Sequence, residues 1–304
     1  MPARTPSTQW QEQVAPDESE RFARYAQGMV ASQQRRAKKY GPGRALHRRQ
    51  LVALAATLEV LPDLPEYARQ GLFATPGSHD AWVRLSNGSM DVASDRKPDV
   101  RGFAFKVFGV DGPNALGTGT TTTQDFLLIN HAAFSVPKSA AFMDLVLALE
   151  RGPFALLGYL VRTYGFLGAL RQAKKLQSVL GKPFSGFATE RLFSAVPISC
   201  GAWAARVRLL PPREPGPSAA KLDWVDDLGK HLAQGPLVYR MQLQFFVDEA
   251  TTPIEDASVD WPESEAPYVD VARLTIAPRM SRSCDGRPAT NLGRIARPGL
   301  AART

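Results

Sequence analysis

The stretch "DVRGFAFKVF", residues 99–108, decides the fold class of this chain. It holds three phenylalanines and two valines among ten residues and is followed by Gly109. This composition is typical of a β-strand that ends at a turn. Comparable runs, rich in aromatic or β-branched residues and bounded by Gly, Asn, Asp or Pro, occur at 81–88, 125–131, 193–210, 237–248 and 269–277. The sequence therefore predicts two groups of strands, one in each half of the chain.

Helical patterns precede and separate these groups. Residues 17–39 begin with acids and end with bases, as the helix dipole prefers, and "GPG" at 41–43 ends the helix. A second helical region is predicted over 137–182, and "LVALAATLEVL" (51–61) stays open between helix and strand. The threonine-rich piece 118–123 is predicted to be a loop. Without βαβ alternation, this order favours a single α+β domain with a largely antiparallel sheet closed into a barrel.

Composition and charge exclude several classes of protein. The chain has 304 residues and a net charge of +8 at pH 7. Its bases gather between residues 35 and 49 and again between 279 and 303, but no nucleic-acid-binding signature accompanies either cluster, so we expect no nucleic-acid partner. Two cysteines are too few for a disulfide framework and fit a reducing compartment.

The remaining apolar segments argue for a cytoplasmic protein. The first 16 residues have no apolar core, so they are not a secretory signal and are expected to form a loose arm. The longest apolar run, residues 154–170, is interrupted by Arg162 and three glycines. It falls short of the roughly 20 apolar residues of a spanning helix. We therefore expect no integral membrane segment, and we expect this run to form a buried or groove-covering helix.

Four motifs follow one another between about residues 40 and 278. They are "RALH" (44–47), "VRLS" (83–86), "DVRGFAFKVF" (99–108) and "PIEDASVDWPESEAPYVDVARLTI" (253–276). In these motifs the sequence resembles the catalase family, and specifically its short catalase-like members that lack long C-terminal extensions. The resemblance implies an antiparallel eight-stranded β-barrel that binds haem b. The implied organisation is an arm and helix at 1–40, a haem-binding barrel domain at 41–278 and an arginine-rich tail at 279–304.

The same resemblance implies roles for individual residues. His47 matches the histidine that stands over the iron and moves a proton between the two oxygens of a peroxide. Ser86 matches the serine that bonds the far ring nitrogen and fixes the tautomer. Arg44 and Arg84 match arginines that pair with the haem propionates, while the next arginines, 48 and 49, are expected to be solvated. Phe134 falls near the aromatic residue that packs on the porphyrin.

The chain departs from the family at two places. Thr122 stands at or near the position of an asparagine in hydrogen-peroxide catalases, which favours peroxidase activity or organic hydroperoxides over fast dismutation. Moreover, the family holds its iron with a C-terminal tyrosinate, yet no tyrosine follows Tyr268. In the family an arginine stands four residues before this tyrosine. The pairs Arg21/Tyr25 and Arg36/Tyr40 have the same spacing but precede His47, so we do not expect either tyrosine to bind iron. The iron ligand is therefore unknown.

Three hypotheses about the function stay open at this point. The first is a haem peroxidase that takes a peroxide and a small organic electron donor. The second is a catalytically impaired haem- or lipid-binding protein without the proximal tyrosine. The third is an enzyme that rearranges fatty-acid hydroperoxides, for which residues 154–170 would line an apolar channel. A homo-oligomer is compatible with each of them.

Overall fold

The computed structural model describes residues 3–113, 119–214, 223–278, 280–282 and 288–290. The strands are β1 Gln50–Val60, β2 Gly77–Asn87, β3 Arg101–Pro113, β4 Thr120–Ile129, β5 Leu192–Phe193, β6 Ile198–Cys200, β7 Trp203–Leu210, β8 Leu237–Phe245, β9 Tyr268–Ile276, β10 Met280–Arg282 and β11 Pro288–Thr290. The helices are α1 Glu18–Tyr40, α2 Ser139–Arg151, α3 Pro153–Leu180 and α4 Trp224–Ala233, with short 3-10 helices at Glu66–Ala68 and Gly71–Phe73.

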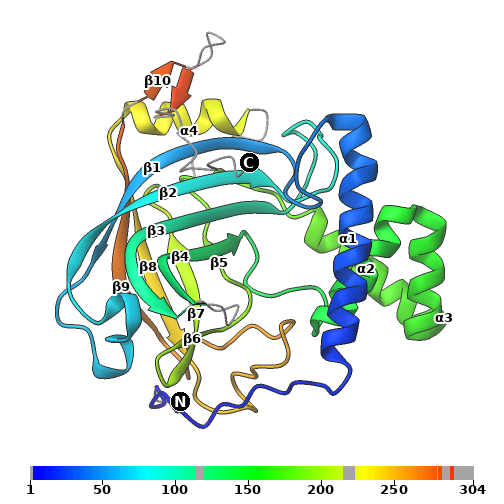
Figure 1. The fold of residues 1–304 in the computed structure, drawn as a ribbon, viewed down its shortest axis with the longest axis horizontal. Coiled ribbons are helices and arrows are strands. Elements are labelled where there is room, and N and C mark those ends of the chain that lie inside the picture. The colour runs from blue at the N-terminus through cyan, green and yellow to red at the C-terminus, as the bar shows by residue number, and fades with distance from the viewer. Residues whose placement is uncertain (1–2, 114–118, 215–222, 279, 283–287, 291–304) are drawn as a thin grey trace, which may run out of the picture.

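Eight antiparallel strands close into a barrel (Figure 1). Their order is β5-β4-β3-β2-β1-β9-β8-β7, and β5 pairs with β7 to complete the circle, while β6 extends β7 as a short hairpin. The predicted α+β fold with an eight-stranded antiparallel barrel is thus confirmed. Segment 51–61, which periodicity left open, is strand β1.

The barrel interior is a packed core. On β3, Phe103, Phe105 and Val107 are buried, whereas Ala104 and Lys106 between them are partly exposed on the outer face. This alternation is the period of two that a strand imposes. Helix α4 lies across one end of the barrel (Figure 1) and buries its leucines there. The inside of the barrel is therefore filled, and any ligand site must lie outside it.

Two sequence-based boundaries were wrong. The run 193–210 is not one strand but β5, β6 and β7, because the chain turns at Ala195 and Gly201, both with φ of 60°. The threonines at 120–123 do not form a loop but begin β4, where they pair with the end of β3. Threonine is β-branched and suits a strand, which the low complexity of the segment concealed.

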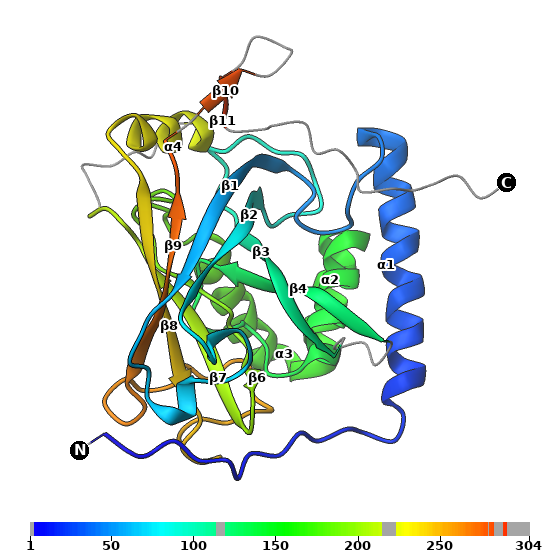
Figure 2. The same cartoon turned by 60° about the vertical axis from the view of Figure 1, so that its left-hand side comes forward.

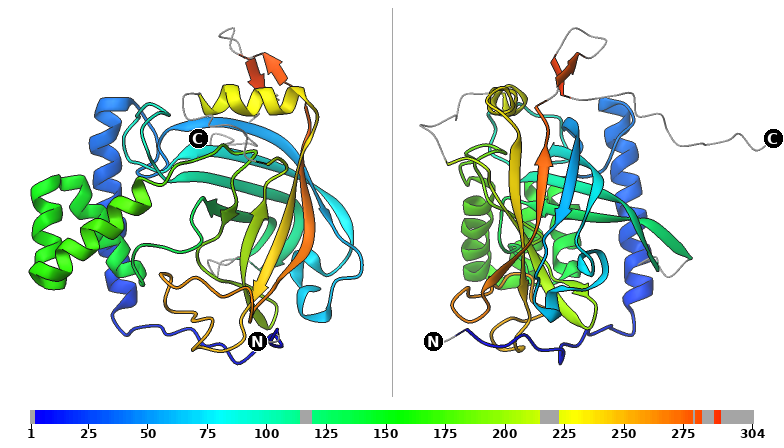
Figure 3. Two further views of the ribbon diagram at one scale, coloured as in Figure 1. Left: turned by 180° about the vertical axis from the view of Figure 1, so that it is seen from behind. Right: turned by 90° about the vertical axis from the view of Figure 1, so that its left-hand side faces the viewer.

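Helices α1, α2 and α3 stand beside the barrel rather than over its ends (Figures 2 and 3). The predicted helix at 17–39 is confirmed as α1. The region 137–182 is helical but broken at Gly152, with φ of 107°, and bent again at Gly165, with φ of 67°. Such angles are open to glycine and costly for other residues, so each break follows from the residue present.

The run 154–170 within α3 is not the buried helix that we expected. Phe154 is 89% exposed and Leu167 is 75% exposed. By length and composition alone, α3 is long and apolar enough to cross a membrane, with 17% of its most apolar window buried. That property is weak evidence by itself, and the bend at Gly165 divides the helix.

The N-terminal segment is not loose either. The backbone N–H of Arg4 donates to the carbonyl of Glu265, and that of Ser7 donates to Phe246, each at 2.8 Å. Farther along, Trp10 packs against a small buried cluster that includes Phe246, and its indole donates to the carbonyl of Ala202 at 2.9 Å. Backbone hydrogen bonds and one partly buried tryptophan thus hold an otherwise polar arm on the barrel.

The proposed division into arm, barrel domain and tail stays a prediction. The eight barrel strands all fall between residues 41 and 278. Most of the tail 279–304 lies outside the described residues, which include only the small β10–β11 hairpin there.

Candidate functional site

His47 lies just before β1, against the outer surface of the barrel. Its backbone N–H donates to the carbonyl of Gly88 at 3.0 Å, and its Nδ1 is 3.1 Å from Oγ of Ser86 on β2. The residue has a φ of 48°, a conformation that non-glycine residues adopt at a cost and that clusters at functional sites. The structure therefore brings together the histidine and serine that the sequence predicted as partners.

Gly102 on β3 makes room for this pair. A Cβ at Gly102 would stand 2.5 Å from His47 Nδ1 and 2.8 Å from Ser86 Oγ. Real Cβ atoms do not approach other atoms so closely, so only glycine lets the imidazole lie on the strand. The sequence analysis assigned no role to Gly102. A glycine inside a strand pattern could have indicated that another group approaches the strand closely at this position.

The environment of His47 keeps its imidazole neutral. Burial, together with the positive charges of Arg84 and Arg44, lowers its pKa from 6.5 to about 4 against the opposing effect of Asp99. At neutral pH the ring is thus an unprotonated base. With Nδ1 engaged by Ser86, Nε2 has no hydrogen-bond partner within the described residues and can exchange a proton with a ligand.

A buried polar network holds the loop between β2 and β3 under His47. Asp95 in this loop accepts from the amide of Asn87 at 2.9 Å and pairs with Arg49 at 2.8 Å. Arg101, only 2% exposed, donates to Asn87 and to the carbonyls of Asp95 and Lys97. The network fixes the backbone to which His47 is hydrogen-bonded.

The arginines that follow His47 are not merely solvated, contrary to expectation. Arg49 forms the ion pair with buried Asp95, and Arg48 donates to the carbonyls of Arg44 and Gly41. Both side chains therefore hold the segment that carries His47. The sequence did not indicate which backbone atoms or acids these two arginines would contact.

A shallow groove of about 290 Å³ runs along the outer face of β1–β4 beside this segment. Its floor includes the small residues Ala53 and Ala104, with Trp82 and Leu127 on its walls. Arg44 and Arg84 also line it. In register, Ala53, Arg84, Ala104 and Leu127 form one row across four strands, next to the row that holds Ser86 and Gly102.

The two groove arginines form no ion pair within the described residues. Burial and the neighbouring charge of Arg44 lower the pKa of Arg84. Two like charges held together at the edge of a groove are repulsive until an anion binds between them. The groove is therefore suited to a flat ligand with an apolar body and anionic substituents.

The structure does not bring Thr122 or Phe134 to this groove. Thr122 lies toward the start of β4, seven residues from Ile129, which pairs with Gly102. That separation is about 23 Å along a strand. The Phe134 ring packs instead against Phe142 of α2, with centroids 5.4 Å apart. Their assignment to the haem site stays a prediction.

No tyrosine, histidine or cysteine lines the groove among the described residues. In the two Arg/Tyr pairs that precede His47, the Tyr25 hydroxyl donates to the carbonyl of Ala140 and the Tyr40 hydroxyl donates to Asp91. Cys284 lies outside the described residues. Within the described residues no cluster of metal-ligating side chains occurs.

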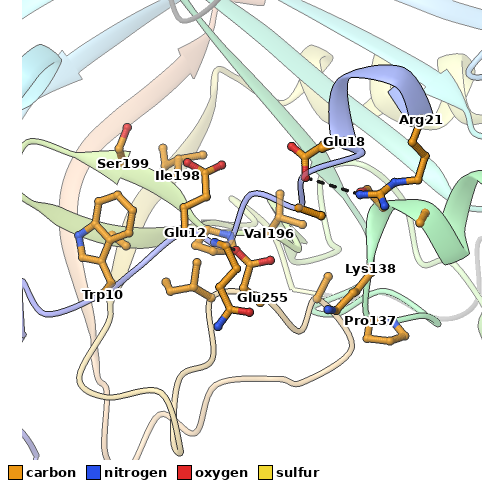
Figure 4. Close-up of a pocket in the computed structure, with 18 residues that line it drawn as sticks. Trp10, Glu12, Glu18, Arg21, Pro137, Lys138, Val196, Ile198, Ser199 and Glu255 are labelled. Atoms are coloured by element: carbon orange, nitrogen blue, oxygen red, sulfur yellow. Dashed lines mark hydrogen bonds and ion pairs between the residues drawn. The ribbon is translucent and has the colours of Figure 1, made fainter. Parts of the chain in front are cut away.

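A larger hollow lies elsewhere in the structure. It measures about 590 Å³ and is enclosed by the N-terminal arm, the loop before α2 and β6, with Glu12, Glu18, Glu255 and Lys138 at its surface (Figure 4). His131 lies at a third hollow, beside Lys182 and Glu190. None of the predicted site residues lines either of them.

Comparison with known proteins supports the fold. No family model and no curated protein matches the sequence. Among solved structures, a bacterial catalase is similar with a TM-score of 0.58 and 16% identity over 91% of this chain and 55% of that one. A fungal catalase is similar with a TM-score of 0.59 and 16% identity over 95% and 57%. The protein has a catalase-like fold and spans little more than half the length of these catalases.

Proposed function

We propose that this protein is a haem-dependent, catalase-related peroxidase. It would reduce hydrogen peroxide or organic hydroperoxides with electrons from a small organic donor. The observation that carries the proposal is a buried neutral histidine beside a shallow groove and its two arginines, which form no ion pair within the described residues. This combination unites a proton-transfer group with a binding site for an anionic planar cofactor.

The residues of the groove fit one face of haem b. Arg44 and Arg84 would pair with its propionates, since guanidinium groups bind carboxylates through two parallel hydrogen bonds. Ala53 and Ala104 leave room for a flat ring, and Trp82 and Leu127 provide apolar contact. The described lining residues offer no axial ligand of a usual type, so none is assigned. When bound, haem supplies the iron that coordinates peroxide and takes up its oxidising equivalents.

The protein's own contribution is the movement of one proton. Nε2 of His47 takes the proton from the peroxide oxygen that reacts and returns it to the oxygen that departs. For Nε2 to accept, Nδ1 must carry the ring proton and donate it to Oγ of Ser86. This hydrogen bond keeps the ring oriented, and the low pKa leaves Nε2 unprotonated at neutral pH. Such acid/base assistance contributes about 10²–10⁴-fold in rate.

The test is the visible absorption spectrum of the full chain loaded with haem, before and after peroxide. We expect a Soret band that survives desalting and shifts when peroxide is added. His47→Ala should keep the band but lose peroxide consumption by about 10²-fold or more. His79→Ala is the matched control, because His79 lies away from the groove with Nδ1 near the carbonyl of Phe108, and it should behave as the wild type.

Two results would overturn the proposal. A band that is lost on desalting would mean that the groove does not hold haem and would favour the impaired binding protein. A stable band whose peroxide reactivity is the same in His47→Ala would mean that the histidine does not act in proton transfer.

A further inference from the structure

Helix α3 carries a concentration of exposed apolar side chains that the barrel does not use. Seven of the fifteen large hydrophobic residues exposed in the described chain lie in this one helix. The most exposed are Phe154 at 89%, Leu167 at 75% and Phe166 at 70%. Single exposed apolar residues are normal on a folded protein, whereas a concentration of them marks a contact site.

The helix forms a bent unit that projects from the side of the molecule (Figures 1 and 3). Gly165, with φ 67° and ψ 174°, divides it into segments 153–164 and 166–180. Tyr159, Leu160 and Ala169 are buried in a cluster with residues of α2. The inner side of the unit is therefore occupied, and the exposed phenylalanines and leucines face away from it.

The charge that α3 itself carries has a single sign. No acidic residue occurs between residues 151 and 189. Four basic residues of α3 are exposed and form no ion pair within the described residues: Arg162, Arg171, Lys174 and Lys175. Apolar side chains next to unpaired bases are the combination by which proteins lie on anionic membrane surfaces.

We propose that α3 docks this protein peripherally on an anionic phospholipid bilayer. Phe154, Phe166 and Leu167 insert at the level of the headgroups while the lysines contact anionic lipid. The segments of α3, 12 and 15 residues by their bounds, are about 18 and 23 Å long, so neither crosses a hydrocarbon core of about 30 Å. The helix therefore lies on the membrane rather than across it.

A second copy of the chain is the competing occupant of this surface. A symmetric dimer would place α3 against the same element of its partner, because such an interface uses one patch twice. That arrangement would oppose two sets of unpaired bases, and like charges across an interface are strongly disfavoured. The charge pattern therefore favours the bilayer.

The experiment is co-sedimentation of the full chain, without haem, with vesicles of phosphatidylcholine alone or mixed with phosphatidylserine. We expect binding to the mixed vesicles that falls with rising salt, and little binding to the neutral ones. The charge reversal Lys174→Glu/Lys175→Glu should weaken binding by roughly tenfold or more. The exposed-residue change Phe166→Ser/Leu167→Ser should do the same.

Matched controls separate docking from general effects of charge and hydrophobicity. Arg96→Glu/Lys97→Glu makes the same change in net charge on an exposed loop, and Val92→Ser removes an exposed apolar side chain there. Both should bind as the wild type does.

Equal loss of binding in the control variants, equal binding to neutral vesicles, or no binding to either kind of vesicle would overturn the proposal. Self-association that only the α3 variants abolish, without vesicle binding, would assign the surface to a second copy. A negative result in the vesicle experiment would not bear on the proposed haem site, because the protein is tested without haem.

Discussion

At the scale of the residue, the smallest side chain of the site sets its geometry. Gly102→Ala would place a methyl group 2.5 Å from His47 Nδ1 and 2.6 Å from Cε1. The imidazole must then move off the strand, and we expect a loss of about 1–3 kcal/mol in the free energy of unfolding, as overpacking costs elsewhere. Chemical denaturation monitored by fluorescence measures this loss.

The matched control for Gly102 is Gly77 on the neighbouring strand. A Cβ there meets nothing within 4 Å. Gly77→Ala should change stability by no more than about 0.5 kcal/mol, as surface substitutions usually do. Equal effects at the two glycines would show that His47 does not depend on the space at Gly102.

His47 also predicts a particular pH dependence of stability. Its pKa is about 4 in the folded chain against 6.5 in the unfolded one, so the unfolded state binds the proton more readily. Its contribution to stability is complete above pH 6.5 and is lost as pH falls toward 4. The loss is on the order of 3 kcal/mol.

Comparison with His47→Gln isolates this contribution from the other titrating groups. We expect the stability advantage of the wild type over the variant to shrink between about pH 7 and about pH 4.5. Denaturation curves at several pH values measure it. Parallel pH profiles of the two proteins would contradict a buried neutral histidine.

The residue scale also shows what the sequence could predict of the site. The contact between His47 and Ser86 was expected from the resemblance of their motifs to the catalase family, and the structure places the two side chains 3.1 Å apart. The role of Gly102 was missed, since a van der Waals distance between a strand and a loop is not encoded in any local pattern. The same holds for Arg49, whose partner Asp95 lies 46 positions away.

At the scale of the element, the loop between β2 and β3 is held by buried charge. Asp95→Ala would remove the buried carboxylate that pairs with Arg49 and accepts from the amide of Asn87. Removing one partner of a buried pair costs about 3–5 kcal/mol, so we expect a loss of that order in unfolding free energy. Urea denaturation, with hydrogen exchange at Gly88 as the local probe, measures it.

An exposed ion pair provides the contrast. Glu59 and Arg273 are 3.9 Å apart on neighbouring strands, and both side chains are more than half exposed. Glu59→Ala should cost less than about 1 kcal/mol. If Asp95→Ala proved as mild as Glu59→Ala, the loop would not depend on its buried network.

Elements were predictable where composition and periodicity agreed. Helix α1 and strands β2, β3, β8 and β9 were found within a few residues of their ends. The division of 193–210 into three strands was not predicted, because it depends on backbone angles at Ala195 and Gly201 that the strand-like composition of the run does not indicate. Residues 154–170 were expected to form a buried or groove-covering helix, because the composition of a short apolar run does not tell whether the run packs against protein or lies exposed.

At the scale of the whole molecule, the eight strands and the groove form one cooperative unit, since β1–β4 provide both the barrel wall and the site. A ligand that binds only the folded groove must therefore stabilise the whole fold. Haem at about 100 times its dissociation constant would add about 2.7 kcal/mol to the free energy of unfolding. For a chain of this length the melting temperature should rise by roughly 4 °C.

The two groove arginines make this prediction specific. In Arg44→Gln/Arg84→Gln the like-charge repulsion disappears, so the ligand-free variant should melt no lower than the wild type, while the anionic ligand loses its partners. Haem should then raise the melting temperature of the wild type and leave that of the variant nearly unchanged in differential scanning calorimetry. A shift of equal size in both proteins would mean that haem binds without its propionates meeting Arg44 and Arg84. The groove on β1–β4 would then no longer explain the cofactor site.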